Sequence, residues 1–156
     1  MILDSGERTT YETGAVRDIK EGKGRMDLCP LDVLSFYLDS KFLGHLYNFV
    51  RTKEIKHLHL ALDQFLEETK WDKYTAILKV SQHYEEGAKK YGEHNWEKGI
   101  PTHSYLDSAC RHYIKWCRGD DDEPHDRAVI WNILGLIWTK IHHPECDDIK
   151  NPEENS

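Results

Sequence analysis

The sequence predicts an all-α protein, a helical bundle of four to five helices preceded by an irregular arm rich in Gly, Lys and Arg. Apolar residues recur at intervals of three and four between residues 31 and 141, as expected for amphipathic helices. Glycine or proline opens or closes most of these segments, and no long strand-like alternation interrupts them. The length of 156 residues corresponds to about one domain, which is large enough to bury a core.

The composition is that of an ordinary globular protein, with 38% hydrophobic and 31% charged residues. A net charge of −7 argues against a nucleic-acid partner, although a local basic pocket would still bind a nucleotide. No stretch approaches the ~20 apolar residues that span a bilayer, and the N-terminus lacks the apolar run of a signal peptide. We therefore expect no membrane partner and a cytoplasmic location. The four cysteines form no C-x-x-C motif, which favours buried free thiols in a reducing compartment.

We expect three parts: an N-terminal arm, residues 1–30, as a candidate phosphate-contacting loop, a helical domain, residues 31–143, and a flexible tail, residues 144–156. The arm shows no helical period. It gathers three cations among glycines, namely Arg17, Lys23 and Arg25. Exposed backbone N–H groups next to cations suit a phosphate, whereas the alternative is a solvated arm lying over the bundle.

The first helical segment is expected from about residue 31 to residue 50, with a bend near Gly44. A second amphipathic run covers residues 55–66. The third helix is expected to begin after Asp72, as its N-cap, and to end at Tyr91, where Gly92 stops it. These segments supply the scaffold of the predicted bundle.

The third helix carries charged residues near its C-terminal end. At 100° per residue, Glu85 falls within the apolar face that contains Tyr74, Ile77 and Leu78, and Glu86 falls on its edge. A carboxylate that faces a bundle interior needs a metal ion or a cation as partner. Lys89 and Lys90 lie in the last turn, where they suit either the helix dipole or a phosphate.

The fourth helix is expected to start at a capping box formed by Ser104 and Asp107. Asp107 and Arg111 are four residues apart and form a predicted ion pair on one flank, whereas His112 lies on the opposite flank. Trp96, in the preceding loop, either stacks on a base or plugs the core.

The last helix opens with four acids in a row, Asp120 to Glu123, followed by Pro124. One or two acids suit the positive end of a helix, but four repel one another unless a cation is near. The helix itself is apolar on nearly every side, which predicts a central position. Asn132 is its lone polar residue and lies seven residues after His125, on the same face. A buried amide must find partners, either on a neighbouring helix or on a substrate base.

These blocks together resemble a known family. The chain contains T-G-A-V-R-D-I-K-E-G-K-G-R-M-D-L-C-P, then G-A-K-K-Y-G-E-H-N-W-E-K-G, then L-D-S-A-C-R-H, then acids followed by H-x(6)-N. This pattern is similar to the phage dATP/dGTP diphosphohydrolases, which are MazG-like all-α nucleoside triphosphate pyrophosphohydrolases. The resemblance covers about residues 12–30 and 81–137. It implies a helical bundle that cleaves a purine deoxynucleoside triphosphate between the α and β phosphates, with Mg²⁺ or Mn²⁺ as cofactor, as a homo-oligomer (dimer or tetramer).

The resemblance also implies roles for individual residues. The expected metal ligands are Glu85, Glu86, Asp122, Glu123 and Asp126, and the expected catalytic groups are Glu86, Glu123 and His125. The expected phosphate-binding residues are Arg17, Lys23, Arg25, Lys89, Lys90 and Arg111. The expected base or sugar contacts are Asn95, Trp96, His112 and Asn132.

The chain departs from the wider superfamily at the first metal motif, because Glu85 and Glu86 stand adjacent where E-x-x-E is usual. The second motif, E-x-x-D, is matched by Glu123 and Asp126, although related phage proteins favour the acid and His125. The adjacent pair His125–Asp126 also fits a histidine/aspartate-type metal phosphohydrolase. A further alternative is a nucleotide-binding or interaction module without enzymatic activity.

Overall fold

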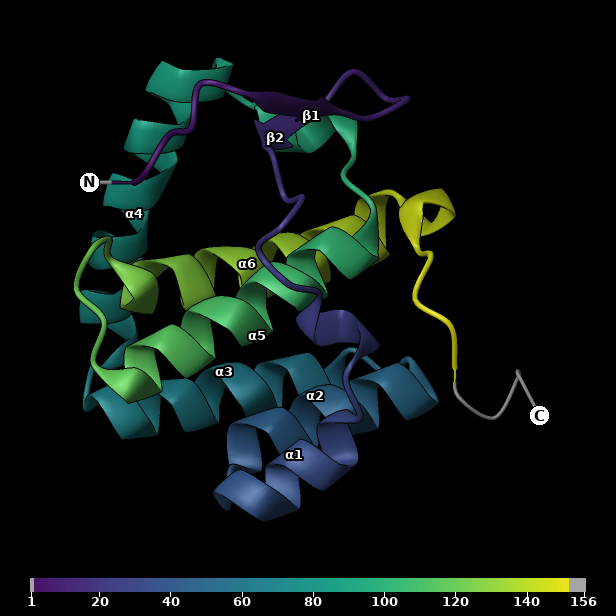
Figure 1. The fold of residues 1–156 in the computed structure, drawn as a ribbon, viewed down its shortest axis with the longest axis vertical. Helices are drawn as coiled ribbons and strands as arrows, with labels where there is room; N and C mark the ends of the chain where they lie inside the picture. The colour runs from purple at the N-terminus through teal and green to yellow at the C-terminus, as the bar shows by residue number, and fades with distance from the viewer. Residues whose placement is uncertain (1, 152–156) are drawn as a thin grey trace.

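The computed structural model describes residues 2–151, which form a helical bundle with a small hairpin over one end (Figure 1). This confirms the predicted all-α class. The elements are β1 (Arg8–Thr10), β2 (Val16–Asp18), η1 (Met26–Leu28), α1 (Leu31–Leu38), α2 (Lys41–Thr52), α3 (Lys56–Thr69), α4 (Lys73–Tyr91), η2 (Asn95–Lys98), α5 (Thr102–Arg118), α6 (His125–His142) and η3 (Pro144–Cys146). No described helix is long and apolar enough to cross a membrane.

The helices α5 and α6 lie side by side at the centre of the bundle (Figure 1). As predicted, α6 is buried on most of its surface, which follows from its nearly continuous apolar sequence. The two helices approach closely at Gly135, where an added Cβ would lie 2.3 Å from Cε1 of Tyr105. A larger residue would push α5 away, so glycine sets the spacing of the central pair.

The predicted first helix is in fact two helices, α1 and α2. The chain breaks at Asp39, whose φ of 50° is left-handed. Ser40 then caps α2, because its side chain accepts a hydrogen bond from the backbone N–H of Leu43. The sequence signal for this break is a short Asp-Ser pair, which competes locally with the helix although the apolar period continues through it. Gly44 lies within α2 and causes no break.

The limits of α4 agree with the prediction, since the Asp72 side chain accepts a hydrogen bond from the N–H of Thr75 and the helix ends before Gly92. The predicted inner face is right for Tyr84 and Ala88, which line a cavity, but wrong for the N-terminal half of the helix. Ala76, Val80 and His83 face the core, whereas the large apolar residues Tyr74, Ile77 and Leu78 are exposed. Glu85 is consequently exposed as well. The pattern of large apolar residues predicted the wrong side of α4 here, because the buried side contains small residues and a histidine.

The helix α5 begins two residues before the predicted capping box, at Thr102. Ser104 is therefore inside the helix, where its hydroxyl lies 3.0 Å from that of Tyr11 in the arm. Asp107 does not cap the helix, because one carboxylate oxygen accepts the N–H of Met26 at 2.7 Å and the other accepts from Arg111 at 2.8 Å. The predicted ion pair between Asp107 and Arg111 is thus confirmed.

The arm is more ordered than predicted, because β1 and β2 pair in antiparallel register and place Thr9 opposite Arg17. Asn95 fastens this hairpin to the bundle: its amide donates to the carbonyl of Val16 at 2.7 Å and accepts the Val16 N–H at 2.9 Å. The hairpin therefore covers the ends of α4 and α5 (Figure 1).

The segment after α6 does not extend freely as predicted. Asp147 accepts hydrogen bonds from Lys140 and Thr102, each at 2.8 Å, and Asp148 accepts from the N–H of His103 at 2.9 Å. Residues 144–151 are thereby held against the helices, and the remainder of the expected tail, residues 152–156, lies outside the described residues.

The four cysteines are free, as expected, but only Cys110 is buried. Cys117 is exposed, whereas Cys29 and Cys146 are half-buried. The expectation of buried thiols therefore holds for Cys110 alone.

Candidate functional site

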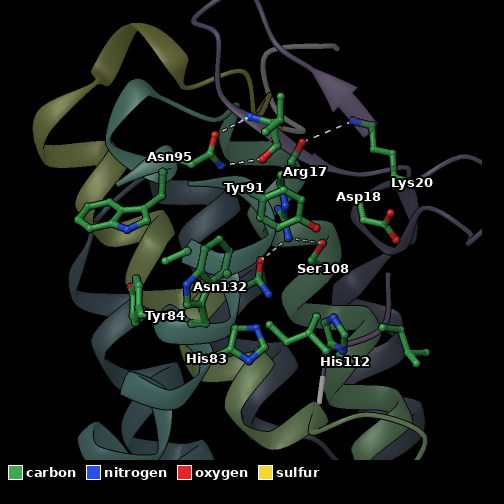
Figure 2. A pocket seen from close by; sticks show the side chains of 18 of the residues that line it. Arg17, Asp18, Lys20, His83, Tyr84, Tyr91, Asn95, Ser108, His112 and Asn132 are labelled. Carbon is green, nitrogen blue, oxygen red and sulfur yellow. Dashed lines mark hydrogen bonds between the residues drawn. The ribbon is translucent and has the colours of Figure 1, made fainter. Parts of the chain in front are cut away.

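A cavity lies beneath the hairpin, between β2, α4, α5 and α6 (Figure 2). Its volume of about 140 Å³ is roughly ten times the 10–15 Å³ that one buried water needs. The cavity is therefore large enough to hold a ligand and is not a small packing defect. Its lining combines cations, aromatic rings and amides, which is the mixture that a nucleotide requires.

Arg17 is the central cation of this cavity (Figure 2). Its Nη2 atom donates to the hydroxyl of Ser108 and to Oδ1 of Asn132, each over 3.2 Å. Its guanidinium lies over the rings of Tyr105 and Trp131, with centroid distances of 5.5 and 5.4 Å. Nη1 is buried and has no hydrogen-bond partner among the described residues. A half-buried arginine with a buried, unpartnered donor favours an anionic ligand, because a buried polar group without a partner is costly.

Three further cations line the cavity and already have partners. Arg111 donates to Asp107 at 2.8 Å, and Lys23 lies 3.2 Å from Asp18. Lys20, which the sequence prediction missed, lies near the imidazole of His103 with its ammonium 2.8 Å from Nε2. Burial lowers the pKa of Lys20 below its ordinary value. The cavity wall thus carries positive charge from the arm and from α5.

The other predicted phosphate ligands lie outside the cavity lining. Arg25 forms an ion pair with Asp27 at 2.7 Å, and Lys89 is exposed on α4. Lys90 donates to the carbonyl of Leu3 and lies over the ring of Tyr91. The structure therefore groups Arg17, Lys23 and Arg111 from the predicted set and separates the other three.

Aromatic side chains form another part of the cavity wall. The ring of Tyr84 packs edge-on against Trp96 at 5.8 Å and tilts against Trp131 at 5.9 Å. Trp96 also meets Trp138 at 4.9 Å, so it is wedged between rings rather than free to stack along both faces. Burial raises the pKa of Tyr84 to about 12, which keeps its hydroxyl protonated. Tyr84 and Trp131 were not predicted, because a residue in an apolar helical face gives no separate signal.

The two predicted amides already have protein partners. Both polar atoms of Asn95 bind the backbone of Val16. Asn132 donates through Nδ2 to the carbonyl of Ala128 at 2.8 Å and accepts from Arg17 through Oδ1. In this arrangement Asn95 fixes β2, and Asn132 acts on the cavity by holding Arg17.

His83 is a buried residue of the cavity wall that sequence reasoning missed. Its Nδ1 atom has no hydrogen-bond partner among the described residues, and its ring lies 5.9 Å from that of Trp131. Burial lowers the pKa of His83 to about 3, and the nearby charge of Arg127 adds to this effect. The ring is therefore neutral near pH 7.

A second polar group lies at the junction of α5 and α6. Nδ1 of His112 is 2.9 Å from Nδ1 of His125, and Nε2 of His125 is 2.7 Å from Oδ1 of Asp122. Glu123 brings Oε1 to 4.0 Å from Nδ1 of His112. Burial, together with the charge of Arg111, holds the pKa of His112 well below its usual value. Since His112 and Glu123 line the cavity, this group is continuous with it.

The predicted set of carboxylate metal ligands does not come together. Glu86 accepts hydrogen bonds from Arg127 and from the N–H of Ile2, each at 3.0 Å, and Glu85 is exposed. Asp126 accepts from the N–H of Arg127 at 2.7 Å. Among the residues that the structure describes, none of these three belongs to a group of converging metal-ligand atoms. The residues therefore do not fit an all-carboxylate Mg²⁺ site built from α4 and α6.

A comparison with family models gives one match. The model described as dATP/dGTP diphosphohydrolase, N-terminal, matches residues 56–149. This range covers more than half of the 156 residues and contains α4, α5 and α6, with His112 and Glu123. The hairpin and Arg17 lie outside it. Comparisons with curated proteins and with solved structures give no significant match.

Proposed function

The chain belongs to the dATP/dGTP diphosphohydrolase family, and from this we propose that it hydrolyses dATP and dGTP to the monophosphate and pyrophosphate. The observation that carries the proposal beyond the family is Arg17, which lines the cavity and whose buried Nη1 atom has no hydrogen-bond partner among the described residues. A guanidinium fork matches the geometry of phosphate oxygens.

The phosphates are proposed to bind between the arm and α5. Lys20 and Lys23 from the arm and Arg111 from α5 surround Arg17 in the cavity lining. These cations are proposed to hold the phosphates and to stabilise the charge that develops as the bond between the α and β phosphates breaks. Asn95 fastens the hairpin to the bundle, so the hairpin already covers the cavity. The triphosphate would therefore be positioned without a large rearrangement.

The base is proposed to lie along the aromatic wall. Tyr84 and Trp131 line the cavity, and the guanidinium of Arg17 lies 5.4 Å from the centre of the Trp131 ring. Rings of this kind support stacking of any base, worth about 1–3 kcal/mol per base. Stacking alone gives no purine preference, so the choice of dATP and dGTP rests on the family and is part of the proposal.

Glu123 is proposed to be a catalytic residue that acts at the attacking water. It lines the cavity, and its carboxylate is largely sheltered from solvent. His125, which is buried and bound to Asp122, holds His112 in place and acts as a positioning residue. A triphosphate also needs a divalent cation to offset its charge, and Mg²⁺ or Mn²⁺ belongs to the proposal. No step is assigned to a Mg²⁺ held by Glu85 or Glu86, because those carboxylates do not converge.

We also propose that the protein is a homo-oligomer, a dimer or a tetramer. Large aromatic and aliphatic side chains are exposed on two helices: Phe36 is 90% exposed on α1, and Tyr74 and Leu78 are 85% and 71% exposed on α4. Exposed apolar surface of this kind favours association. Light scattering after gel filtration tests the assignment. From the sequence resemblance we further propose a role in phage nucleotide metabolism in the cytoplasm of the host.

The experiment that tests the activity is product identification. The protein is incubated with each of the four deoxynucleoside triphosphates and Mg²⁺ or Mn²⁺, and the products are separated by ion-exchange chromatography. The proposal expects monophosphate and pyrophosphate, with dATP and dGTP turned over faster than dCTP and dTTP. Release of intact triphosphate or of orthophosphate would indicate a histidine/aspartate-type phosphohydrolase. The absence of turnover, with stabilisation by nucleotide in a thermal-shift assay, would indicate a nucleotide-binding module.

A further inference from the structure

We propose that His112, Glu123 and His125 form a binding site for a first-row transition metal ion that prefers imidazole ligands, of the Zn²⁺ type. The three side chains offer one ligand atom each, and these atoms all lie within 4.8 Å of one another. The site differs from the carboxylate set predicted from sequence. It uses His112 as a ligand instead of a base contact, and it leaves out Glu85, Glu86 and Asp126.

The helices bring these ligands together with little freedom. His112 lies in α5, His125 is the first residue of α6, and Glu123 precedes it in the short connection. The side chains of His112, Glu123 and His125 are 14%, 12% and 1% exposed. Ligands held on two packed helices and sheltered from water form a preorganised site.

The histidine pair is spaced as two ligands of one ion would be. Its Nδ1 atoms lie 2.9 Å apart. Two nitrogens that each bind an ion at about 2.0–2.1 Å are separated by roughly 3 Å, depending on the angle at the ion. Oε1 of Glu123 lies 4.0 Å from Nδ1 of His112, close enough to join the pair as a third ligand.

Asp122 supplies a second, independent observation. Its carboxylate lies 2.7 Å from Nε2 of His125, which assigns the proton of that ring to Nε2. Nδ1 of His125 therefore carries a lone pair directed at His112. A carboxylate on the far nitrogen is the arrangement that orients metal-binding histidines in proteins.

Without an ion, one proton lies between Nδ1 of His112 and Nδ1 of His125, at the position where the ion would bind. Since Nδ1 of His125 is the acceptor, Nδ1 of His112 must be the donor in the absence of an ion. Binding of an ion replaces that hydrogen bond with two metal–nitrogen bonds, and His112 then carries its proton on Nε2. Binding changes no oxidation state, so no oxidant or reductant is needed.

The donor set selects the class of ion. Two imidazoles and one carboxylate suit Zn²⁺, Fe²⁺, Co²⁺ or Ni²⁺, whereas Mg²⁺ favours oxygen ligands and octahedral geometry. Local charge is also favourable, because Asp122 and Glu123 are negative and Arg111 is offset by Asp107 at 2.8 Å. Three protein ligands leave a position open. Since His112 and Glu123 line the cavity, that position faces the proposed phosphates, and this last step alone rests on the proposed function.

The test measures metal binding without nucleotide, so its result is independent of the proposed activity. Protein stripped with a chelator is titrated with Zn²⁺, Co²⁺ and Mg²⁺ by calorimetry, and the visible absorption of Co²⁺ reports its ligands. We expect about one Zn²⁺ or Co²⁺ per chain and much weaker binding of Mg²⁺. His112→Gln and Glu123→Gln should each weaken binding by at least about tenfold and alter the Co²⁺ spectrum.

Two control variants guard against other sites. His143, Glu145 and Cys146 form a separate group of possible ligands at the surface, and Cys146→Ser removes its thiolate. His59→Gln removes an exposed histidine of α3. Both controls should bind the ion as the wild type does. Undiminished affinity in Glu123→Gln and His112→Gln, loss of binding in Cys146→Ser, or equal affinity for Mg²⁺ would overturn the proposal. Circular dichroism confirms folding, and Glu123→Gln serves as the second test if His112→Gln does not fold.

Discussion

Nη2 of Arg17 donates to Oδ1 of Asn132 over 3.2 Å, joining residues that lie 115 positions apart in the chain. This bond connects the N-terminal hairpin to the central helix α6. It leaves Nη1 of the same guanidinium without a partner among the described residues. Asn132 thus holds the guanidinium of Arg17 in the cavity, and Arg17 in turn supplies the hydrogen-bond donor that the buried amide oxygen of Asn132 requires.

Replacing Arg17 with lysine keeps the charge but removes the fork that holds Ser108, Asn132 and the proposed phosphate. A hydrogen bond to a charged group contributes about 1.5–3 kcal/mol, so we expect KM for dGTP to rise by about 10–100-fold. Steady-state kinetics measures this. Arg25→Lys is the matched control, because Arg25 pairs with Asp27 outside the cavity. Equal effects in both variants would show that Arg17 has no special role.

Asn132→Ala should weaken the binding of all four deoxynucleoside triphosphates to a similar extent. The reason is that both polar atoms of Asn132 have protein partners, and its oxygen holds Arg17. The sequence resemblance implied that Asn132 contacts the base, and such a contact would change the ratio of purine to pyrimidine turnover. A double-mutant cycle with Arg17→Lys should give a coupling of about 0.5–3 kcal/mol, as for residues in one hydrogen-bond network. Additive effects, or an altered base ratio, would return Asn132 to the role of a base contact.

Glu123→Gln should reduce kcat by about 100-fold or more, a loss typical of removing a catalytic carboxylate. Its melting temperature should stay near that of the wild type, since the carboxylate of Glu123 lies 4.0 Å from Nδ1 of His112, beyond hydrogen-bond distance. Glu86→Gln is the contrasting variant. It loses the ion pair with Arg127 and should lower stability slightly with a smaller change in kcat. The reverse pattern would place Glu86 in the reaction and Glu123 in the scaffold.

Stability should depend on pH through His83. Its folded pKa of about 3 lies below the 6.5 of an unfolded histidine. Between these values the unfolded chain binds a proton that the folded chain does not, so this contribution to stability is lost as pH falls. The slope for one such proton is at most about 1.4 kcal/mol per pH unit.

The variant His83→Gln should lessen this slope, measured by urea unfolding between about pH 4.5 and 6.5. His59→Gln, on the exposed face of α3, should leave the slope unchanged. An identical slope in the wild type and His83→Gln would show that His83 is protonated in the folded protein.

Gly135→Ala should destabilise the protein by about 1–3 kcal/mol, because the added methyl group would overlap the ring of Tyr105. Gly87 is the matched helical glycine, since an added Cβ there meets nothing within 4 Å. Gly87→Ala should be neutral or stabilise by up to about 1 kcal/mol through helix propensity. Chemical denaturation of both variants checks the close approach of α5 and α6. Equal stability would contradict it.

The sequence alone was sufficient to predict those helices whose ends or positions depend on neighbouring residues in the chain. Asp72 and Gly92 mark the ends of α4 by their own capping chemistry, and the nearly continuous apolar run of α6 indicates its central position. The break at Asp39 was missed, because the apolar period runs through it. The orientation of α4 was also missed, since Ala76 and His83 face the core while larger apolar residues face outward.

The site was only partly predictable for the same reason. Arg17, Lys23 and Arg111 were recognisable as cations near glycines or in a helical ion pair, and the structure places them around one cavity. Their convergence depends on contacts between segments far apart in the chain, and no local pattern encodes such contacts. His83 and Tyr84 gave no signal, because single polar or aromatic residues on an inner face are common in any core.

The central claim is that this cavity hydrolyses a purine deoxynucleoside triphosphate between its α and β phosphates. The most direct measurement is ³¹P NMR of dGTP during incubation with the wild-type protein, Arg17→Lys and Arg25→Lys. The account predicts that signals of dGMP and pyrophosphate grow with the wild type and with Arg25→Lys, and far more slowly with Arg17→Lys. Formation of other products, or equal rates in all three proteins, would contradict it.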